Sequence, residues 1–248
     1  MRISLILILF FSLILFFILS FQKDDYNFKI KSNTNFENAK YINEVEGCGF
    51  KKNEKGDRKK SAIILVDKKK DITIKNGFFE CTNKSVIFLD RSQNIVISKV
   101  TAAKGSDNVI QINNSFSIVR DSQFSSNHGN YCIEGDNGII ILFNNVIKDC
   151  LIGMEIEKTD DNDYTIIILL NNEFKKIERN IIRCMDRKNQ NSQIYLFIKN
   201  NILENAPYFE KKGKCQNVLD IDDGLEKAIT SNNFDQIKIL VEKKIMGF

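Results

Sequence analysis

A short pattern of apolar and polar positions recurs along residues 72–203. In each copy two residues stand two apart, both apolar except at Ser117 of the third copy. A polar step and a corner, often Asn-rich, follow, and a further apolar residue comes two positions after the corner. The corners lie 23, 22, 23, 27 and 29 residues apart, at positions 77, 100, 122, 145, 172 and 201. A period in the twenties with strand-type alternation is typical of a solenoid, in which every repeat stacks on the one before.

The alternation predicts a strand in each copy, because residues i and i+2 of a strand share one face. Ile72 and Ile74, and their counterparts in the later copies, therefore point inward. Asn tolerates the left-handed backbone conformation that a sharp corner needs, and Gly adopts it freely. We expect three corner pairs to stack as a ladder of side-chain amides: Asn144-Asn145, Asn171-Asn172 and Asn200-Asn201.

A further strand precedes each copy of the pattern. The expected inward pairs are Ile63/Leu65, Val86/Phe88, Ile110/Ile112, Tyr131/Ile133, Met154/Ile156 and, in a shifted register, Ile182/Cys184. Three short strands in each turn of about 22 residues predict a parallel solenoid with a dry, triangular core. The 3.6-residue periodicity of helical repeats is absent from residues 60–205.

This coil resembles the right-handed parallel β-helix of the pectate-lyase-like superfamily over about residues 60–210. The predicted fold class is an all-β solenoid, a right-handed single-stranded parallel β-helix of about six coils with an N-terminal cap and a C-terminal α-helical hairpin. The superfamily includes lyases, glycosidases, tailspikes, adhesins and passive surface proteins. The resemblance therefore implies an architecture and leaves the activity open.

The N-terminal residues 1–21 hold an apolar run, Ile3 to Phe21, that follows Arg2. A run of this length can span a bilayer, and its basic start fits a secretory signal. We expect export to the periplasm, the cell surface or the medium, with residues 1–21 either cleaved as a signal peptide or retained as a membrane anchor. Residues 22–60 are predicted to cap the open end of the β-helix, which is assigned to residues 61–210.

The C-terminal segment, residues 219–248, changes to helical spacing around the turn 231–233. Asp222 gives a start signal for the first helix, and Asp235 is expected to cap the second. Residues 222–245 resemble a single ankyrin-type helix pair, without its Thr-Pro-Leu-His motif. One such pair cannot bury its own faces, so the hairpin is either a cap docked on the solenoid or the start of a truncated array.

The outward positions of the second strand change character along the chain. In the first two coils they are mostly polar, as at Thr73, Lys75 and Ser98. In coils four to six they form one apolar patch, larger than soluble monomers usually expose: Ile139, Ile141, Phe143, Ile166, Ile168, Leu170, Tyr195 and Phe197. We expect the C-terminal hairpin to cover this patch, or failing that a partner or a second copy of the chain.

Candidate chemistry lies on the outer face of the first strand, where the resemblance places the acids and arginines of the enzymes. The sequence offers Glu134, Glu155 and Glu157 there, with Arg183 on the next coil. Coils stack about 4.8 Å apart. Two carboxylates about 5 Å apart suit retaining glycoside hydrolysis. We expect no cofactor; by resemblance to the lyases, Glu134 and Glu155 are the pair that would hold Ca²⁺ if the activity depended on it.

His128 is the only histidine, in a loop that leads into the same strand. Its His-Gly pair matches part of a polygalacturonase-like motif, but the Asn-Thr-Asp part is missing, so no role is carried over. His128 stays a weak catalytic candidate beside the stronger interpretation of an exposed loop residue.

The cysteines stand at positions 48, 81, 132, 150, 184 and 215, all beyond the apolar run. An even count in an exported chain is compatible with disulfides, and no Cys-x-x-Cys spacing indicates zinc. The inward position of Cys184 favours a buried free thiol.

The charge balance is nearly even, with 36 basic and 32 acidic residues. No recognised motif or aromatic–basic interleaving indicates nucleic-acid binding. The chain has no Trp to stack on sugar rings, and six coils make a short groove. We therefore expect a binding or scaffold module for a polysaccharide or protein ligand, with a polysaccharide lyase or glycoside hydrolase as the alternative.

Overall fold

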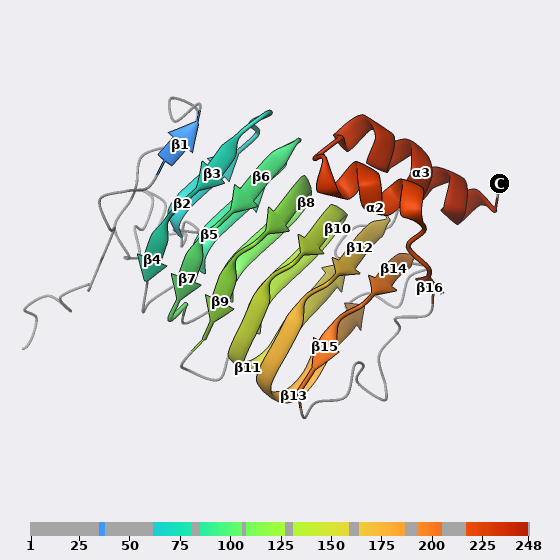
Figure 1. The fold of residues 1–248 in the computed structure, drawn as a ribbon. Coiled ribbons are helices and arrows are strands. Elements are labelled where there is room, and N and C mark those ends of the chain that lie inside the picture. The colour runs from blue at the N-terminus through green and yellow to red at the C-terminus, as the bar shows by residue number, and fades with distance from the viewer. Residues whose placement is uncertain are drawn as a thin grey trace, which may run out of the picture.

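The computed structural model describes residues 35–37, 62–80, 85–105, 108–126, 131–158, 164–186, 193–204 and 217–247. Their strands wind into an all-β parallel solenoid of about five turns, followed by two C-terminal helices (Figure 1). The predicted solenoid is confirmed, with about one turn fewer than expected. The predicted signal or anchor, residues 1–21, and nearly all of the predicted cap, residues 22–60, lie outside the described residues.

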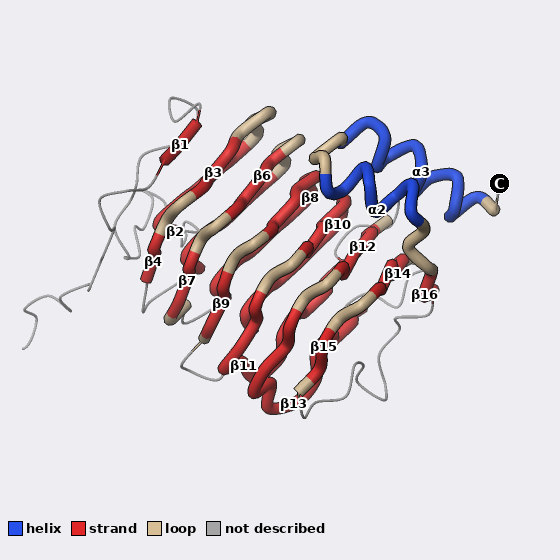
Figure 2. The backbone as a smooth tube through the Cα atoms, viewed as in Figure 1, coloured by secondary structure: helices blue, strands red, loops and turns tan. Residues whose placement is uncertain are grey.

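Each turn contributes to three parallel sheets, and the strands follow one another coil by coil in Figure 2. The first sheet contains the first halves of β8 and β10 and the second halves of β11 and β13, together with two shorter strands. Its members are β2 (Ala62–Asp67), β5 (Ser85–Asp90), β8 (Asn108–Arg120), β10 (Tyr131–Phe143), β11 (Val146–Lys158) and β13 (Glu173–Asp186).

The second and third sheets share the long strands with the first. The second adds to the later halves of β8 and β10 the strands β3 (Thr73–Lys75), β6 (Ile95–Ser98), β12 (Thr165–Leu170), β14 (Ile194–Lys199) and β16 (Asn217–Leu219). The third adds to the early halves of β11 and β13 the strands β4 (Phe78–Glu80), β7 (Thr101–Ala103), β9 (Gln123–Ser125) and β15 (Ile202–Leu203).

At the N-terminal edge of the second sheet, β1 (Asn35–Glu37) pairs with β3 in the antiparallel direction. It comes from the segment predicted to form the cap, and it occupies backbone groups that an open sheet edge would expose. At the other end, β16 extends the parallel pairing beyond residue 210, where the sequence-based boundary of the β-helix was placed.

The corners between the second and third sheets follow the predicted spacing but turn one residue earlier. The left-handed residue of each corner, with φ between 50° and 58°, directly precedes the predicted position: Asn76, Lys99, Asp121, Asn144, Asn171 and Asn200. The second member of each Asn pair therefore keeps ordinary backbone angles. Its side chain is left to turn into the coil, where Asn145 and Asn172 are buried.

The core lies inside the three sheets and contains the predicted inward residues of the second strand, such as Ile72 and Ile74. In the first strand of coils one and two the predicted register is wrong by one residue, although Val86 of the predicted pair Val86/Phe88 does belong to the core. Val66 and Leu89 face the core, while Leu65 and Phe88 lie on the outer side. Both strands are apolar at nearly every position, so their sequences carry no alternation that would fix the face.

A disulfide joins Cys132 to Cys150, which lie 18 residues apart on β10 and β11. Cys184 is disulfide-bonded as well, so the expected free thiol is wrong, and none of the described cysteines is free. The alternation correctly predicted that Cys184 is buried, but burial does not decide whether a thiol is oxidised.

The helices are α2 (Asp223–Thr230) and α3 (Phe234–Met246). The side chain of Asp222 accepts a hydrogen bond of 2.8 Å from the amide of Leu225, which confirms the predicted start of α2. The predicted cap of α3 is wrong: Asn233 accepts from the amide of Gln236, and Asp235 lies inside the first turn. There its charge faces the positive end of the helix dipole.

The hairpin packs on the outer face of the second sheet, and the two form a second hydrophobic core (Figure 1). From the hairpin the buried members include Leu225, Ile229, Ile237 and Val241. From the sheet come all eight residues of the apolar patch, and also Phe116 and Ile118 of β8. The ring of Phe116 meets the ring of Phe234 edge-on, with centroids 4.8 Å apart. In the part of the chain that the structure describes, no helix is long and apolar enough to cross a membrane.

Candidate functional site

Three of the predicted site residues meet on the outer face of the first sheet. Glu134 pairs in register with Glu155, and Glu155 pairs with Arg183. The Nη1 atom of Arg183 lies 3.5 Å from Oε2 of Glu155. The backbone of Glu157 pairs with that of Met185 in the parallel ladder, but the side chain of Glu157 is outside the described part of the structure. His128 lies outside the described residues altogether.

The carboxylate of Glu134 accepts hydrogen bonds from two amides of its own sheet. Asn108 Nδ2 donates to Oε2, and Gln111 Nε2 donates to Oε1 at 3.2 Å. Gln111 stands opposite Glu134 in the ladder, so its place could have been found from the repeat. The contact of Asn108 depends on the end of the strand, which the repeat does not predict.

Tyr131 also belongs to this polar cluster, although the alternation assigned it to the core. Its hydroxyl accepts a hydrogen bond of 3.5 Å from Nη1 of Arg183. Burial raises the pKa of Tyr131, and the neighbouring charge of Glu155 raises it further. The misassignment has a physical cause: the ring is amphipathic, and its polar end needs a partner when buried.

The cluster is arranged as a polar network that is only partly buried, since Tyr131, Glu134 and Arg183 keep some exposure. Glu155 is only 4% exposed, and its charge is compensated by Arg183. A general acid or base must reach the reacting atoms of a substrate, whereas these carboxylates face donors of their own chain. The surroundings do not fit Ca²⁺ between Glu134 and Glu155, since cationic and amide donors already point at the oxygens. Among the described residues, no three or more His, Cys, Asp or Glu side chains are grouped to hold a metal.

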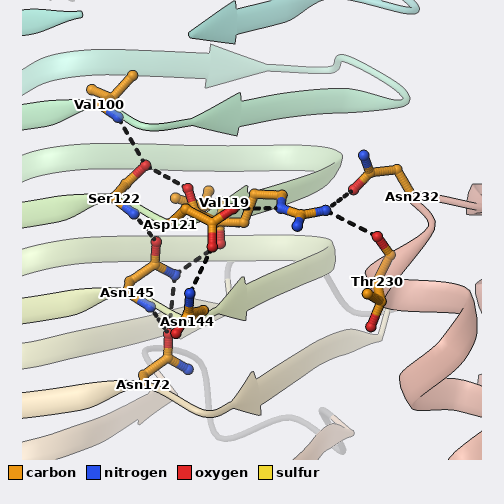
Figure 3. Close-up of polar contacts among 10 residues, drawn as sticks. Val100, Val119, Asp121, Ser122, Asn144, Asn145, Asn172, Thr230 and Asn232 are labelled. Atoms are coloured by element: carbon orange, nitrogen blue, oxygen red, sulfur yellow. Dashed lines mark hydrogen bonds and ion pairs between the residues drawn. The ribbon is translucent and has the colours of Figure 1, made fainter. Parts of the chain in front are cut away.

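A second polar system, the amide ladder, runs along the corner between the second and third sheets (Figure 3). Asn145 Nδ2 donates to Oδ1 of Asn172 at 3.0 Å, and Asn172 Nδ2 donates to Oδ1 of Asn201 at 3.0 Å. The same oxygens accept from the backbone amides of the preceding coil. Ser122 continues the ladder by accepting from the amide of Val100. The predicted stacking of corner amides is confirmed.

Arg120 connects this corner to the turn of the hairpin, where its partners Thr230 and Asn232 are labelled in Figure 3. Its Nη1 atom donates to the carbonyl of Thr230 at 3.0 Å and to Oδ1 of Asn232 at 3.2 Å. The guanidinium lies 5.1 Å from the ring centroid of Phe143, and Nε donates to Asp121 at 2.9 Å. Burial would raise the pKa of Asp121, but hydrogen bonds from Asn144 and Arg120 together lower it.

An open groove of about 450 Å³ lies on the far side of Arg120, over β3 and β6. It is lined by three basic side chains, one acidic side chain and several hydroxyl and amide groups: Thr73, Lys75, Asn76, Val96, Ser98, Lys99, Arg120, Asp121 and Asn232. Among the described residues the hairpin ends at this border, so it leaves the first coils of the second sheet uncovered. We call it the β3–β6 groove.

Comparison of the chain with protein-family models, with curated proteins and with solved structures finds no match. The resemblances to the pectate-lyase-like superfamily and to an ankyrin-type helix pair therefore rest on the sequence pattern alone, and the structure itself shows a parallel β-solenoid with two C-terminal helices.

Proposed function

We propose that the protein is a binding module that displays the β3–β6 groove to an acidic polysaccharide. The observation that carries this proposal is the groove itself, where Lys75, Lys99 and Arg120 stand among hydroxyl and amide groups on an uncovered sheet face. Cationic side chains recognise carboxylates or sulfates, and hydroxyls and amides can both donate to and accept from sugar hydroxyls.

The form of the groove supports an extended ligand. Its lining comes from three successive coils. Lys75 and Arg120 are in register with Ser98 of the coil between them, and Lys99 follows Ser98 at the corner. Neighbouring coils are about 4.8 Å apart. A chain of sugar units laid along the solenoid would therefore meet a charged group at each coil.

Export to the periplasm, cell surface or medium belongs to the same proposal. The disulfide between Cys132 and Cys150 and the disulfide state of Cys184 support it, since disulfides persist in oxidising compartments. We also propose that the coil is of the right-handed pectate-lyase-like type. The hairpin is proposed to be a cap, because its apolar face is buried on the sheet.

A carbohydrate-active lyase or hydrolase is the second candidate. The specific observation in its favour is that Glu134, Glu155 and Arg183 stand on three adjacent strands of one outer face. The two candidates differ in what they predict for a soluble acidic polymer: the enzyme shortens it, and the binding module retains it unchanged.

The test compares retention of the protein in gels containing polygalacturonate or the neutral polymer dextran. We expect retention by polygalacturonate alone, with a loss that increases with salt. The variant Lys99→Glu should weaken retention about five- to tenfold, because removing and reversing one exposed charge costs about 1 kcal/mol or slightly more.

The matched control is Lys243→Glu, which makes the same charge change on an exposed position of α3. If both variants lose the same retention, the effect is one of net charge and not of the groove. If dextran retains the protein as strongly as polygalacturonate does, the proposal is contradicted. Shortened polymer that depends on Glu155, tested with Glu155→Gln, would favour the enzyme.

A further inference from the structure

A second cleft, of about 330 Å³, lies at the opposite end of the second-sheet strands, between the solenoid corner and α3. We call it the α3 cleft. It is lined by amides, two apolar side chains, an aromatic ring and one cation: Gln93, Asn114, Ser115, Phe116, Asn137, Gly138, Ile139, Tyr164 and Lys238. It shares none of these residues with the β3–β6 groove.

The wall formed by the solenoid is a rigid corner. Asn114 and Asn137 both hold left-handed backbone conformations, with φ of 47° and 48°. Asn137 Nδ2 donates to Oδ1 of Asn114 at 3.3 Å. Gly138 has φ of 98°, and a Cβ atom there would lie 2.4 Å from the carbonyl oxygen of Ser115, so the tight turn requires glycine. The amide of Gly138 donates to the carbonyl of Tyr164, which fixes the next coil in place.

The polar groups of this wall are suited to a ligand with many hydroxyls. Gln93, Asn114 and Asn137 each carry an amide, which is both a donor and an acceptor. The Oδ1 atom of Asn137 is buried and makes no hydrogen bond within the described part of the chain. A buried acceptor in this state can accept one further hydrogen bond, from a water or a ligand hydroxyl.

The remaining side chains of the cleft indicate a ligand that has a flat apolar face and a negative charge. Tyr164 is 40% exposed and offers an aromatic surface at the rim, while Phe116 and Ile139 form an apolar part of the lining. Among the described residues that line the cleft, Lys238 alone carries a charge. An aromatic surface, hydroxyl-seeking amides and one cation complement a single sugar ring that carries one carboxylate.

We propose that the α3 cleft binds one uronic-acid unit, with Lys238 facing its carboxylate and the corner amides facing its hydroxyls. The inference rests on the proposed function for the class of ligand, but it adds a separate site. It also gives the hairpin a second role, because the burial of Ile237 and Val241 against the sheet holds Lys238 over the cleft.

The test is ligand-observed NMR and calorimetry on the full chain with galacturonic acid, its methyl ester and galactose. We expect galacturonic acid to bind most tightly. Lys238→Gln should weaken it about five- to tenfold and leave the two neutral sugars unchanged, whereas Tyr164→Leu should weaken all three. Lys243→Gln on the same helix is the control and should change nothing. A Lys238→Gln variant that binds the acid as tightly as the wild type, or a wild type that binds none of the three sugars, would overturn the inference.

The variant Lys99→Glu keeps this test separate from that of the proposed function. It should reduce retention by polygalacturonate and leave the binding of galacturonic acid unchanged. If polymer retention depends on Lys99 while no monosaccharide binds, the inference about the α3 cleft fails and the proposed function stands. If the acid binds through Lys238 and the polymer is not retained, the α3 cleft stands and the β3–β6 groove is not the binding site.

Discussion

The two ends of the second sheet share a backbone and differ in what covers them. One column of outward positions runs in register from β3 to β14: Thr73, Val96, Ile118, Ile141, Ile168 and Phe197. The first two are partly exposed, and the last four are fully buried beneath the hairpin. The inward residues of the coil are similar throughout, so the outward residues alone decide which coils stay open.

This difference also explains where the two hollows lie. The hairpin binds as far as the apolar residues extend and stops where Arg120 replaces them. Beyond Arg120 the uncovered face becomes the β3–β6 groove, and along α3 the edge of the cover becomes the α3 cleft. Both candidate sites therefore lie at the boundary between the exposed part of the second sheet and the part that the hairpin covers.

The largest effect is expected when the packing of α3 on the second sheet is weakened. Ile237→Ala should destabilise the protein by about 2–5 kcal/mol, because it leaves a cavity between α3 and the sheet. Ile239→Ala is the matched control, since Ile239 lies on the same helix and is 50% exposed. It should cost less than about 0.5 kcal/mol. Urea unfolding measures both values, and equal costs would show that the hairpin does not bury Ile237 as described.

Removing the Cys132–Cys150 disulfide tests whether the stability of the coil is independent of the hairpin that covers it. Replacing both Cys132 and Cys150 by Ser should cost about 3 kcal/mol, the expected value for a closed loop of similar length. The folded variant should not bind a hydrophobic dye, because the hairpin should still cover the apolar patch of the second sheet. Dye binding by the folded variant would indicate that coil and cover are not independent.

The amide ladder gives a smaller effect. Asn172→Val removes the acceptor of Asn145 and the donor to the carbonyl of Leu142. Leaving such buried groups unpaired costs about 1–3 kcal/mol. Asn171→Gly at the neighbouring left-handed position should be nearly neutral. A thermal melt that is unchanged in Asn172→Val would contradict the ladder.

The smallest expected effect concerns the start of the hairpin. A hydrogen bond from Lys244 and the amide of Leu225 lower the pKa of Asp222 below its ordinary value of 3.8. The folded state therefore favours the carboxylate, so its contribution is present above pH 3.8 and is lost as the pH falls through the lowered pKa. Asp222→Ala should cost about 1 kcal/mol at neutral pH. The difference from wild type should shrink below about pH 4. A difference that is the same at pH 3 and pH 7 would count against the cap.

Much of the coil could be predicted because its inward positions obey one rule in every turn. Ile72, Ile95 and Asn172 are where the repeat puts them, since a one-residue shift would expose a whole face. The rule did not give the correct register for the first strands of coils one and two. Their outer residues, such as Phe88, are apolar and only 5% exposed, so both registers satisfy the sequence pattern.

The candidate sites were predicted only in part. The stacking of Glu134, Glu155 and Arg183 followed from the repeat alone. The network around them did not, because the contact of Asn108 depends on the end of its strand. The α3 cleft depends on where Lys238 lands when the hairpin docks, and sequence spacing does not report that geometry.

Lysine labelling with an acetylating reagent, read by mass spectrometry, tests the central claim most directly. That claim is that the polymer lies in the β3–β6 groove of the open coils. On addition of polygalacturonate the labelling of Lys99 should fall severalfold, while exposed Lys176 on the third sheet and Lys243 on α3 keep their rates. Unchanged labelling of Lys99, or protection of Lys176 and Lys243 to the same degree, would contradict the account.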